Sequence, residues 1–415
     1  MSPKSSSAAT SAAELAAFQS DDEGRSPRHL GSYDSGQPGP LVVLFGAIHG
    51  NEPAGVIAIQ RVLEALRSRG LPLLGKVMGL VGNRSGHARK ARYLARDLNR
   101  RWLVPEMVAL LGRDPASDSP EDREQRELLH LFAPLCAAAR EPIVFLDLHS
   151  TSGAGAPFSC MADVLRNRPI AFALPVPVVL GLEEVIDGSM LGFLADLGHV
   201  GVAVEGGQHD DPRTVEHHEA AIWLCLVTAG CLRAEQVGDL QRHHERLAAA
   251  TRGLPPVLEI RHRHVVHDDD DFEMRPGYAN FHPVARGEVV AGDRRGEVKT
   301  PEAGVMMLPR YQSKGEDGYF LARAVSPTWL AISAGLRRIR ADRLVTLLPG
   351  VERDPGAADH MLVEADRPRA VDVFHLLGYR HQRARGERFV FSRRRPDFQS
   401  LEDLPAAMRE LLRRV

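Results

Sequence analysis

The feature that most constrains the fold is a regular alternation between short apolar runs and amphipathic segments, which begins near residue 41. The apolar runs include LVVLFGAIH (41–49), KVMGLVGN (76–83), PIVFLDLH (142–149) and VGVAVEGG (200–207). Between the first two lies VIAIQRVLEALRSRG (56–70), whose apolar residues recur at helical spacing. This rhythm is typical of α/β proteins in which helices cover a mostly parallel mixed sheet.

Changes in composition divide the 415 residues into four predicted parts. Residues 1–36 are rich in Ser, Ala, Gly and Pro, which favours a flexible tail. Residues 37–253 form the α/β domain, and residues 254–345, with short β-like pieces between Gly and Pro, form a small β domain. Residues 346–415 read as a C-terminal α+β extension whose role the sequence does not indicate.

Composition narrows the class of partner. The formal net charge of −2 gives no electrostatic reason to expect nucleic acid or an anionic membrane, so a small molecule or a short peptide is the expected ligand. Four cysteines without a C-x-x-C pair fit a reducing compartment, and no stretch of about 18 apolar residues predicts a membrane span. We therefore expect a cytoplasmic protein, and its oligomeric state stays open.

Two of the apolar runs end in histidine, at His49 and His149, and Glu52 follows His49 by three residues. A single H-x-x-E is weak evidence, but a short-spaced pair with a distant third donor is the plan of a catalytic zinc site, which leaves one position for water. Ligands of α/β sheets bind beyond the carboxyl ends of the strands, where these residues fall. Asp147 then either orients an imidazole or makes an ordinary strand-end hydrogen bond or salt bridge.

A third run ends in Glu205, directly before two glycines, and a carboxylate there can act as general base beside a metal. The alternative is a strand-end glutamate that caps the next helix. Between the runs lies an arginine-rich segment (84–101), which is either a surface patch or a carboxylate-binding loop. In the second case Arg100 grips an anionic substrate and Asn99 adds an amide.

Four signatures occur in order: H-G-N-E (49–52), D-L-N-R (97–100), D-L-H (147–149) and V-E-G-G (204–207). Together they resemble the succinylglutamate desuccinylase/aspartoacylase family, a branch of the zinc-carboxypeptidase (M14-like) fold, over about residues 40–330. The resemblance implies that one Zn²⁺ ion per chain is bound by His49, Glu52 and His149. It also implies that Glu205 serves as general base and acid.

The same resemblance implies that Arg92 stabilises the oxyanion, and that Asn99 and Arg100 hold the α-carboxylate of the amino-acid product. It further implies a small β domain at the pocket mouth, from which either Tyr311 or Tyr319 contributes a side chain. One departure concerns the substrate, since no Lys or Arg occurs from Pro169 to Pro212. A buried carboxylate without a partner is costly, so we expect a substrate with one carboxylate near Arg100 and otherwise neutral groups.

The expected function is a zinc-dependent amidohydrolase that deacylates a small N-acyl amino acid. A metallocarboxypeptidase, which removes C-terminal residues from peptides with the same machinery, is the nearest alternative. A binding protein that keeps the fold without turnover is an alternative of a different class.

Overall fold

The computed structural model describes residues 27–355, 360–364, 368–379, 381–385, 388–392 and 406–414. Most of the predicted N-terminal tail (1–36) therefore lies outside the described residues. Its last part differs from the prediction, because His29–Asp34 forms strand β1, which pairs antiparallel with β3 (Leu74–Val81) at the edge of the main sheet.

Four neighbouring strands form the part of the sheet that matters most for function, in the order β3-β2-β4-β7. They are β3, β2 (Gln37–Gly46), β4 (Val144–Thr151) and β7 (Val200–Gln208), and all three pairings are parallel. Because the strands run the same way, their carboxyl ends meet at one edge of the sheet. The register sets His149 opposite Glu205 at that edge.

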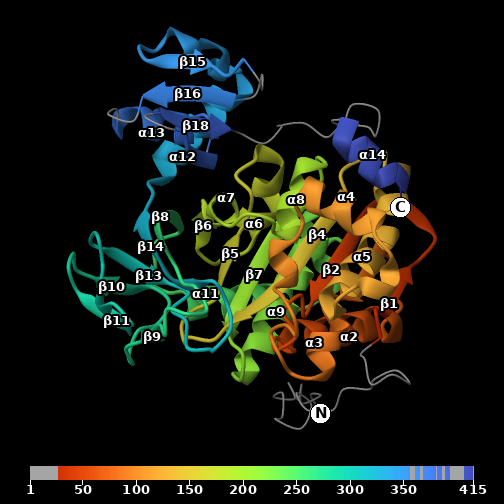
Figure 1. Ribbon diagram of the computed structural model, residues 1–415. Coiled ribbons are helices and arrows are strands. Elements are labelled where there is room, and N and C mark those ends of the chain that lie inside the picture. Colours follow the sequence, from red (N-terminus) through yellow and green to blue (C-terminus); the bar gives the residue numbers. More distant parts are fainter. Residues whose placement is uncertain are drawn as a thin grey trace.

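Helices cover both faces of this sheet (Figure 1), which confirms the predicted mixed α/β fold. One face packs against α2 (Ala54–Ser68), α9 (Pro212–Thr228) and α11 (Leu240–Ala250). The other packs against α4 (Val104–Gly112), α5 (Pro120–Ala138) and α8 (Met190–Asp196). Strand alternation supplies both cores, since Leu44 faces the first set of helices and Phe45 the second.

Shorter helices connect these elements. They are α3 (Arg84–Ala88), η1 (Leu98–Arg100), η2 (Pro115–Ser117), η3 (Leu165–Asn167), α6 (Arg168–Ala173), α7 (Leu182–Val185) and α10 (Ala234–Val237). No helix within the described ranges is both long and apolar enough to cross a membrane.

The predicted small β domain continues the large sheet. Beyond β7 the order is β5-β6-β8-β14-β13-β10. These strands are β5 (Phe158–Cys160), β6 (Val178–Leu180), β8 (Val257–Val265), β14 (Asp317–Ala324), β13 (Gly304–Met307) and β10 (His282–Val284). A separate three-stranded sheet joins β12 (Gly296–Lys299), β11 (Val289–Asp293) and β9 (Glu273–Met274). A boundary near residue 254 therefore stays a proposal.

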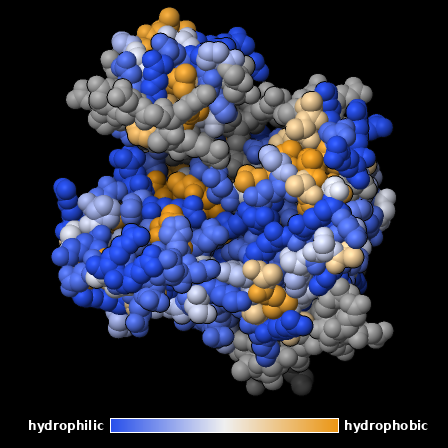
Figure 2. Space-filling view, in the orientation of Figure 1, coloured by the Kyte–Doolittle hydropathy of each residue, from blue (hydrophilic) through white to orange (hydrophobic). Residues whose placement is uncertain are grey.

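The C-terminal region contains α12 (Pro327–Arg338), η4 (Ala341–Leu347), α13 (Pro368–Leu376) and a four-stranded antiparallel sheet. Its strands are β15 (Val351–Arg353), β16 (His360–Glu364), β18 (Arg388–Ser392) and β17 (His381–Arg385). This sheet stands apart from the main body, whereas α14 (Ala406–Arg414) returns to pack near α4 (Figure 1). Most of the face shown in Figure 2 is hydrophilic, and apolar side chains gather in the hollow below the C-terminal sheet.

Candidate metal centre and pocket

The turn between β2 and α2 carries the first two predicted ligands. Ala47 has a left-handed backbone (φ 54°), a strained conformation for a residue with a side chain. After this bend His49 and Glu52 face each other, with His49 Nδ1 2.8 Å from Glu52 Oε1. Gly50 is required at the turn, since a Cβ there would lie 2.1 Å from the backbone of Gly86.

The third predicted ligand comes from the end of β4. His149 Nδ1 lies 3.1 Å from Glu52 Oε2, and the backbone N–H of Ser150 donates to that same oxygen at 3.0 Å. One ligand atom from each of His49, Glu52 and His149 lies within 4.8 Å of the others, and all three side chains are buried. Among the described residues this is the one cluster of three such donors that can hold a metal ion.

A carboxylate stands behind each imidazole. Both histidines turn Nδ1 toward Glu52, which leaves Nε2 of each ring for an outer partner. For His149 that partner is Asp147, with Oδ2 at 3.0 Å; His49 Nε2 lies 2.9 Å from Arg92 Nη2 and 3.3 Å from Asp97 Oδ1. Such outer carboxylates fix the ring orientation of metal-binding histidines. The sequence suggested this role for Asp147 but not for Asp97, although Asp97 opens the D-L-N-R signature.

The charges of the cluster suit a cation. Burial opposes ionisation of Glu52, but His49 and His149 outweigh it and hold the pKa of Glu52 well below its ordinary value. Burial also acts against the charged form of His149, yet Asp147 and Glu52 raise the pKa of its imidazole well above the usual value. The buried carboxylates thus retain a proton on His149, and a metal ion can replace that positive charge.

Glu205 lies beside the cluster on β7, opposite His149 in the strand register. Its carboxyl group is buried, and Oε2 has no hydrogen-bond partner in the described part of the chain. Burial raises the pKa of Glu205 to about 7; His149 acts against that rise and Glu52 adds to it. A carboxyl group with such a pKa can both accept and donate a proton near neutral pH.

Gly206, the next residue, leaves room for a histidine that the sequence did not assign to the site. A Cβ at Gly206 would lie 2.5 Å from Nε2 of His218, which bonds to the backbone carbonyl of His149 at 2.9 Å. The first glycine of the V-E-G-G signature therefore allows His218 to pack against the end of β4, which carries His149.

The arginine-rich segment reaches the same cavity. Arg92 donates to Asp97 Oδ2 through Nε and Nη2, at 3.2 and 2.9 Å, and its Nη1 lies 3.9 Å from Glu52. Buried Glu121, which the sequence did not single out, holds this segment. Its carboxylate accepts the backbone N–H groups of Leu94, Ala95 and Arg96.

Asn99 and Arg100 both line the cavity, but each already has a partner in the fold. The side-chain oxygen of Asn99 accepts the N–H of Met190 at 2.9 Å, so its amide N–H₂ is the group left to face a ligand. Arg100 Nη2 donates to Asp317 Oδ2 at 2.7 Å, and Nη1 donates to the Asn99 carbonyl at 3.0 Å. Asp317, from the start of β14, was not predicted as a site residue.

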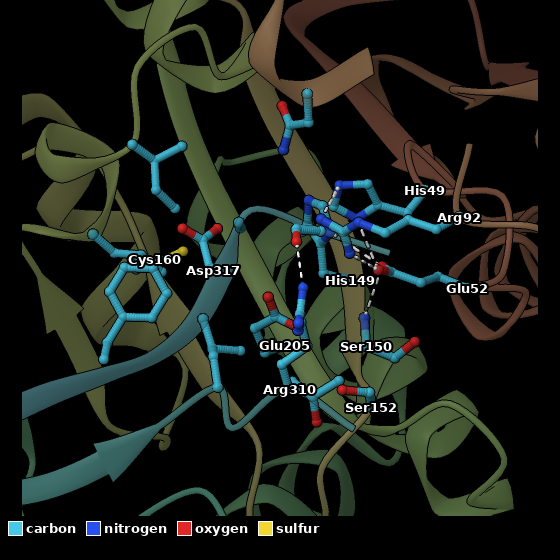
Figure 3. Close-up of a pocket in the computed structure, with 18 of the residues that line it drawn as sticks. His49, Glu52, Arg92, His149, Ser150, Ser152, Cys160, Glu205, Arg310 and Asp317 are labelled. Carbon is cyan, nitrogen blue, oxygen red and sulfur yellow. Dashed lines mark hydrogen bonds and ion pairs between the residues drawn. The ribbon is translucent and has the colours of Figure 1, made fainter. Parts of the chain in front are cut away.

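The cavity has a volume of about 750 Å³, including the part open to solvent, and joins the His-Glu-His cluster to the β13–β14 region (Figure 3). One wall is apolar and consists of Cys160, Leu182, Ile186, Ala203, Leu308 and Phe320. Neither predicted tyrosine lines the cavity. Tyr319 is fully buried in the core of the β region, and the hydroxyl of Tyr311 donates to the Arg275 carbonyl at 2.8 Å.

Comparison with known proteins identifies the family of this chain. The succinylglutamate desuccinylase/aspartoacylase catalytic domain matches residues 38–222. A protein described as a probable aspartoacylase, from Synechococcus sp. (strain CC9605), is 30% identical over 256 residues, which are 59% of this chain and 75% of that protein. The chain belongs to the succinylglutamate desuccinylase/aspartoacylase family. Membership in this family points to hydrolase activity of the deacylase type.

Two solved structures share the fold. The succinylglutamate desuccinylase/aspartoacylase from Rhodobacter sphaeroides superposes with a TM-score of 0.51 at 18% identity, over 70% of this chain and 87% of that one. The product-bound ectoine utilization protein EutE from Ruegeria pomeroyi gives a TM-score of 0.50 at 17% identity, over 71% of this chain and 87% of that one. At these identities the likeness concerns architecture alone.

Proposed function

We propose that this family member is a zinc-dependent hydrolase that cleaves the amide bond of a small N-acyl amino acid. The observation that carries the proposal is the position of Glu205. Its buried carboxylate, with Oε2 unpartnered in the described chain, stands beside three buried donors of the type and number found in catalytic zinc sites.

His49, Glu52 and His149 would hold the metal ion, and the two-nitrogen, one-oxygen donor set suits zinc. When bound, zinc supplies a Lewis acid that polarises the substrate carbonyl and makes a nearby water more acidic. Asp147 and Asp97 keep the two imidazoles oriented with Nδ1 toward Glu52.

Glu205 handles the proton of the reaction. It accepts a proton from the attacking water, whose oxygen bonds to the carbonyl carbon of the amide. When the C–N bond breaks, Glu205 returns that proton to the leaving nitrogen, and the remaining hydroxyl proton of the acid passes to the amine, so an ammonium and a carboxylate are released. Arg92, 3.9 Å from Glu52 and held by Asp97, donates hydrogen bonds to the oxygen on which negative charge develops.

The arginine-rich segment orients the substrate. Arg100 Nε is buried without a partner among the described residues, and the Asn99 amide N–H₂ is directed by the bond that its oxygen makes to Met190. Both groups would bind the α-carboxylate of the amino-acid part. The apolar wall around Leu182 and Phe320 receives the uncharged remainder.

The test is release of free amine from a panel of N-acyl amino acids and short peptides by the zinc-loaded protein. Deacylation of the acyl amino acids, reduced about 100-fold or more in Glu205→Gln with zinc content unchanged, supports the proposal. Glu219→Gln is a matched control, because Glu219 pairs with Arg61 away from the cavity. Loss of C-terminal residues from peptides alone would favour a metallocarboxypeptidase, and bound zinc without any turnover would favour a binding protein.

A further inference from the structure

A loop between β13 and β14, residues 309–316, closes one side of the cavity. The hydrogen bonds that attach it to the body of the protein include Tyr311 N–H to Ser152 Oγ (3.1 Å), Asn51 Nδ2 to Gln312 Oε1 (3.2 Å) and Lys314 Nζ to the Tyr93 carbonyl (2.8 Å). Asn51 belongs to the H-G-N-E signature, so the loop is tied directly to the turn that carries His49 and Glu52.

A strained residue directs this loop toward the cavity. Leu308 has a left-handed backbone with φ 51°, and its N–H donates to Asn280 Oδ1 at 2.6 Å. A branched side chain in this region costs on the order of 1 kcal/mol or more, which the surrounding contacts must offset. Arg310 follows two residues later and lines the cavity.

The Arg310 guanidinium has hydrogen-bond partners, but no carboxylate of the described residues lies within 4.0 Å of it. Its Nη1 donates to the Gly315 carbonyl at 2.7 Å, its Nη2 donates to the Phe272 carbonyl at 3.2 Å, and the group lies 5.0 Å from the Phe272 ring centroid. Nε is buried without a partner, and Arg310 makes no ion pair within 4.0 Å in the described chain. Carbonyl groups accept its hydrogens but leave its full positive charge unbalanced.

Arg100 and Arg263, in contrast, each have a carboxylate partner. Asp317 accepts from Arg100 Nη2 at 2.7 Å and from Arg263 Nε at 2.6 Å. Asp317 therefore serves two guanidinium groups, whereas Arg310 has no carboxylate within 4.0 Å among the described residues. Asp317 and Asp268 attract Arg310 electrostatically, but neither lies within ion-pair distance of its guanidinium.

We propose that Arg310 is a specificity-determining residue that binds a second anionic group of the substrate, in addition to the carboxylate at Arg100. This rests on the proposed deacylase function and changes the substrate expected from the sequence. The absence of Lys and Arg between Pro169 and Pro212 predicted a substrate with one carboxylate. The structure brings the second cation from a different part of the chain, the β13–β14 loop.

The test compares substrates that differ only in one charge. N-acetylglutamate against N-acetylglutamine varies the amino-acid side chain, and N-succinylalanine against N-succinamylalanine varies the acyl end. We expect the wild-type protein to favour the charged member of one pair by about tenfold or more in kcat/KM. Arg310→Met should abolish that preference through a higher KM for the charged member, with the neutral member changed by less than about twofold, and Arg310→Lys should restore part of it.

Arg286→Met serves as control, since Arg286 is exposed at the β10–β11 turn and does not line the cavity. Equal preference for charged and neutral members in the wild type, or equal losses for both in Arg310→Met, would overturn the role of Arg310 and leave deacylation intact. If no acyl amino acid is turned over, the proposed function fails. The charge preference is then tested separately by calorimetry. Binding to zinc-loaded Glu205→Gln, with and without Arg310→Met, is measured for N-acetylglutamate, N-acetylglutamine, N-succinylalanine and N-succinamylalanine. Neutral members bound as tightly as their charged counterparts in both pairs would contradict it.

Discussion

Asp97 places one carboxylate oxygen 3.3 Å from Nε2 of His49 and the other 2.9 Å from Nη2 of Arg92. One buried side chain thereby orients a proposed metal ligand and a proposed oxyanion-binding group at the same time. Burial works against ionisation of this carboxyl, but Arg92, His49 and Arg100 hold its pKa well below the ordinary value. The D-L-N-R signature thus contributes an outer carboxylate as well as groups that face the substrate.

Asp97→Asn should weaken zinc binding by about 10- to 100-fold, because the amide cannot accept from His49 and Arg92 with a full negative charge. Competition with a chromophoric chelator measures this affinity. Asp114→Asn, at an exposed turn far from the cluster, provides the matched control. Zinc affinity equal to that of the wild type in Asp97→Asn would show that the His49 ring is held without this carboxylate.

Gly206→Ala should destabilise the protein by about 1–3 kcal/mol, because the added Cβ meets the His218 ring at 2.5 Å. Displacement of His218 also weakens its bond to the His149 carbonyl, so zinc affinity should fall with stability. Urea unfolding measures the first effect. Gly112→Ala is the matched control, since no atom lies within 4 Å of its added Cβ and alanine suits a helix end better than glycine. A Gly206→Ala protein as stable as Gly112→Ala would refute the close contact.

Glu121→Ala should raise KM and lower kcat/KM by about tenfold or more, because three backbone N–H groups of the arginine-rich segment lose their acceptor. Zinc content should stay at one per chain, since Glu121 does not contact the His-Glu-His cluster. Glu141→Ala, at an exposed position, should leave the kinetics unchanged. Loss of zinc in Glu121→Ala would assign this glutamate to the metal cluster instead.

Acid should destabilise the fold through His199. Burial, with a smaller effect from Arg166, lowers the pKa of His199 to about 4, and its Nδ1 accepts the N–H of Ile143 at 3.2 Å. The unfolded chain takes up a proton near the ordinary value of about 6.5, whereas the folded chain does so only near 4. The stability from this group is therefore complete above pH 6.5 and is lost as pH falls toward 4, by about 3 kcal/mol.

His199→Asn keeps an acceptor for Ile143 and removes the titration. The free energy of unfolding should then fall less steeply between pH 6.5 and 4 than in the wild type, although His218 titrates in the same window. Unfolding in denaturant at a series of pH values gives both curves. Parallel curves for the two proteins would contradict the assignment.

Periodicity was sufficient to predict the sheet and its covering helices, because each strand of the β3-β2-β4-β7 group is a continuous apolar run. It could not show that strands of residues 254–345 continue that sheet, because this depends on the pairing of β8 with β6 and with β14, both distant along the chain. β1 was missed because a short polar edge strand such as HLGSYD has the composition of a tail.

At the site, the sequence brought His49, Glu52, His149 and Glu205 together through the strand-end argument, and the structure has all four at one edge of the sheet. Sequence analysis did not predict Asp317 and Arg310 as site residues. Arg310 lies in a loop without a signature and Asp317 at the start of β14, and their place at the cavity depends on the antiparallel pairing of β14 with β8 and β13. Leu308 adopts a left-handed backbone conformation, and because it is not a glycine the sequence did not indicate the turn.

The most direct measurement is the zinc dependence of amine release from an N-acyl amino acid. Wild-type protein and Glu205→Gln are each stripped with a chelator and titrated with zinc. We predict that the wild-type rate returns in proportion to zinc up to one ion per chain, whereas Glu205→Gln binds the same amount of zinc and stays at least about 100-fold slower. Full activity in the stripped wild-type protein, or in zinc-loaded Glu205→Gln, would contradict a zinc-dependent hydrolase with Glu205 as its proton carrier.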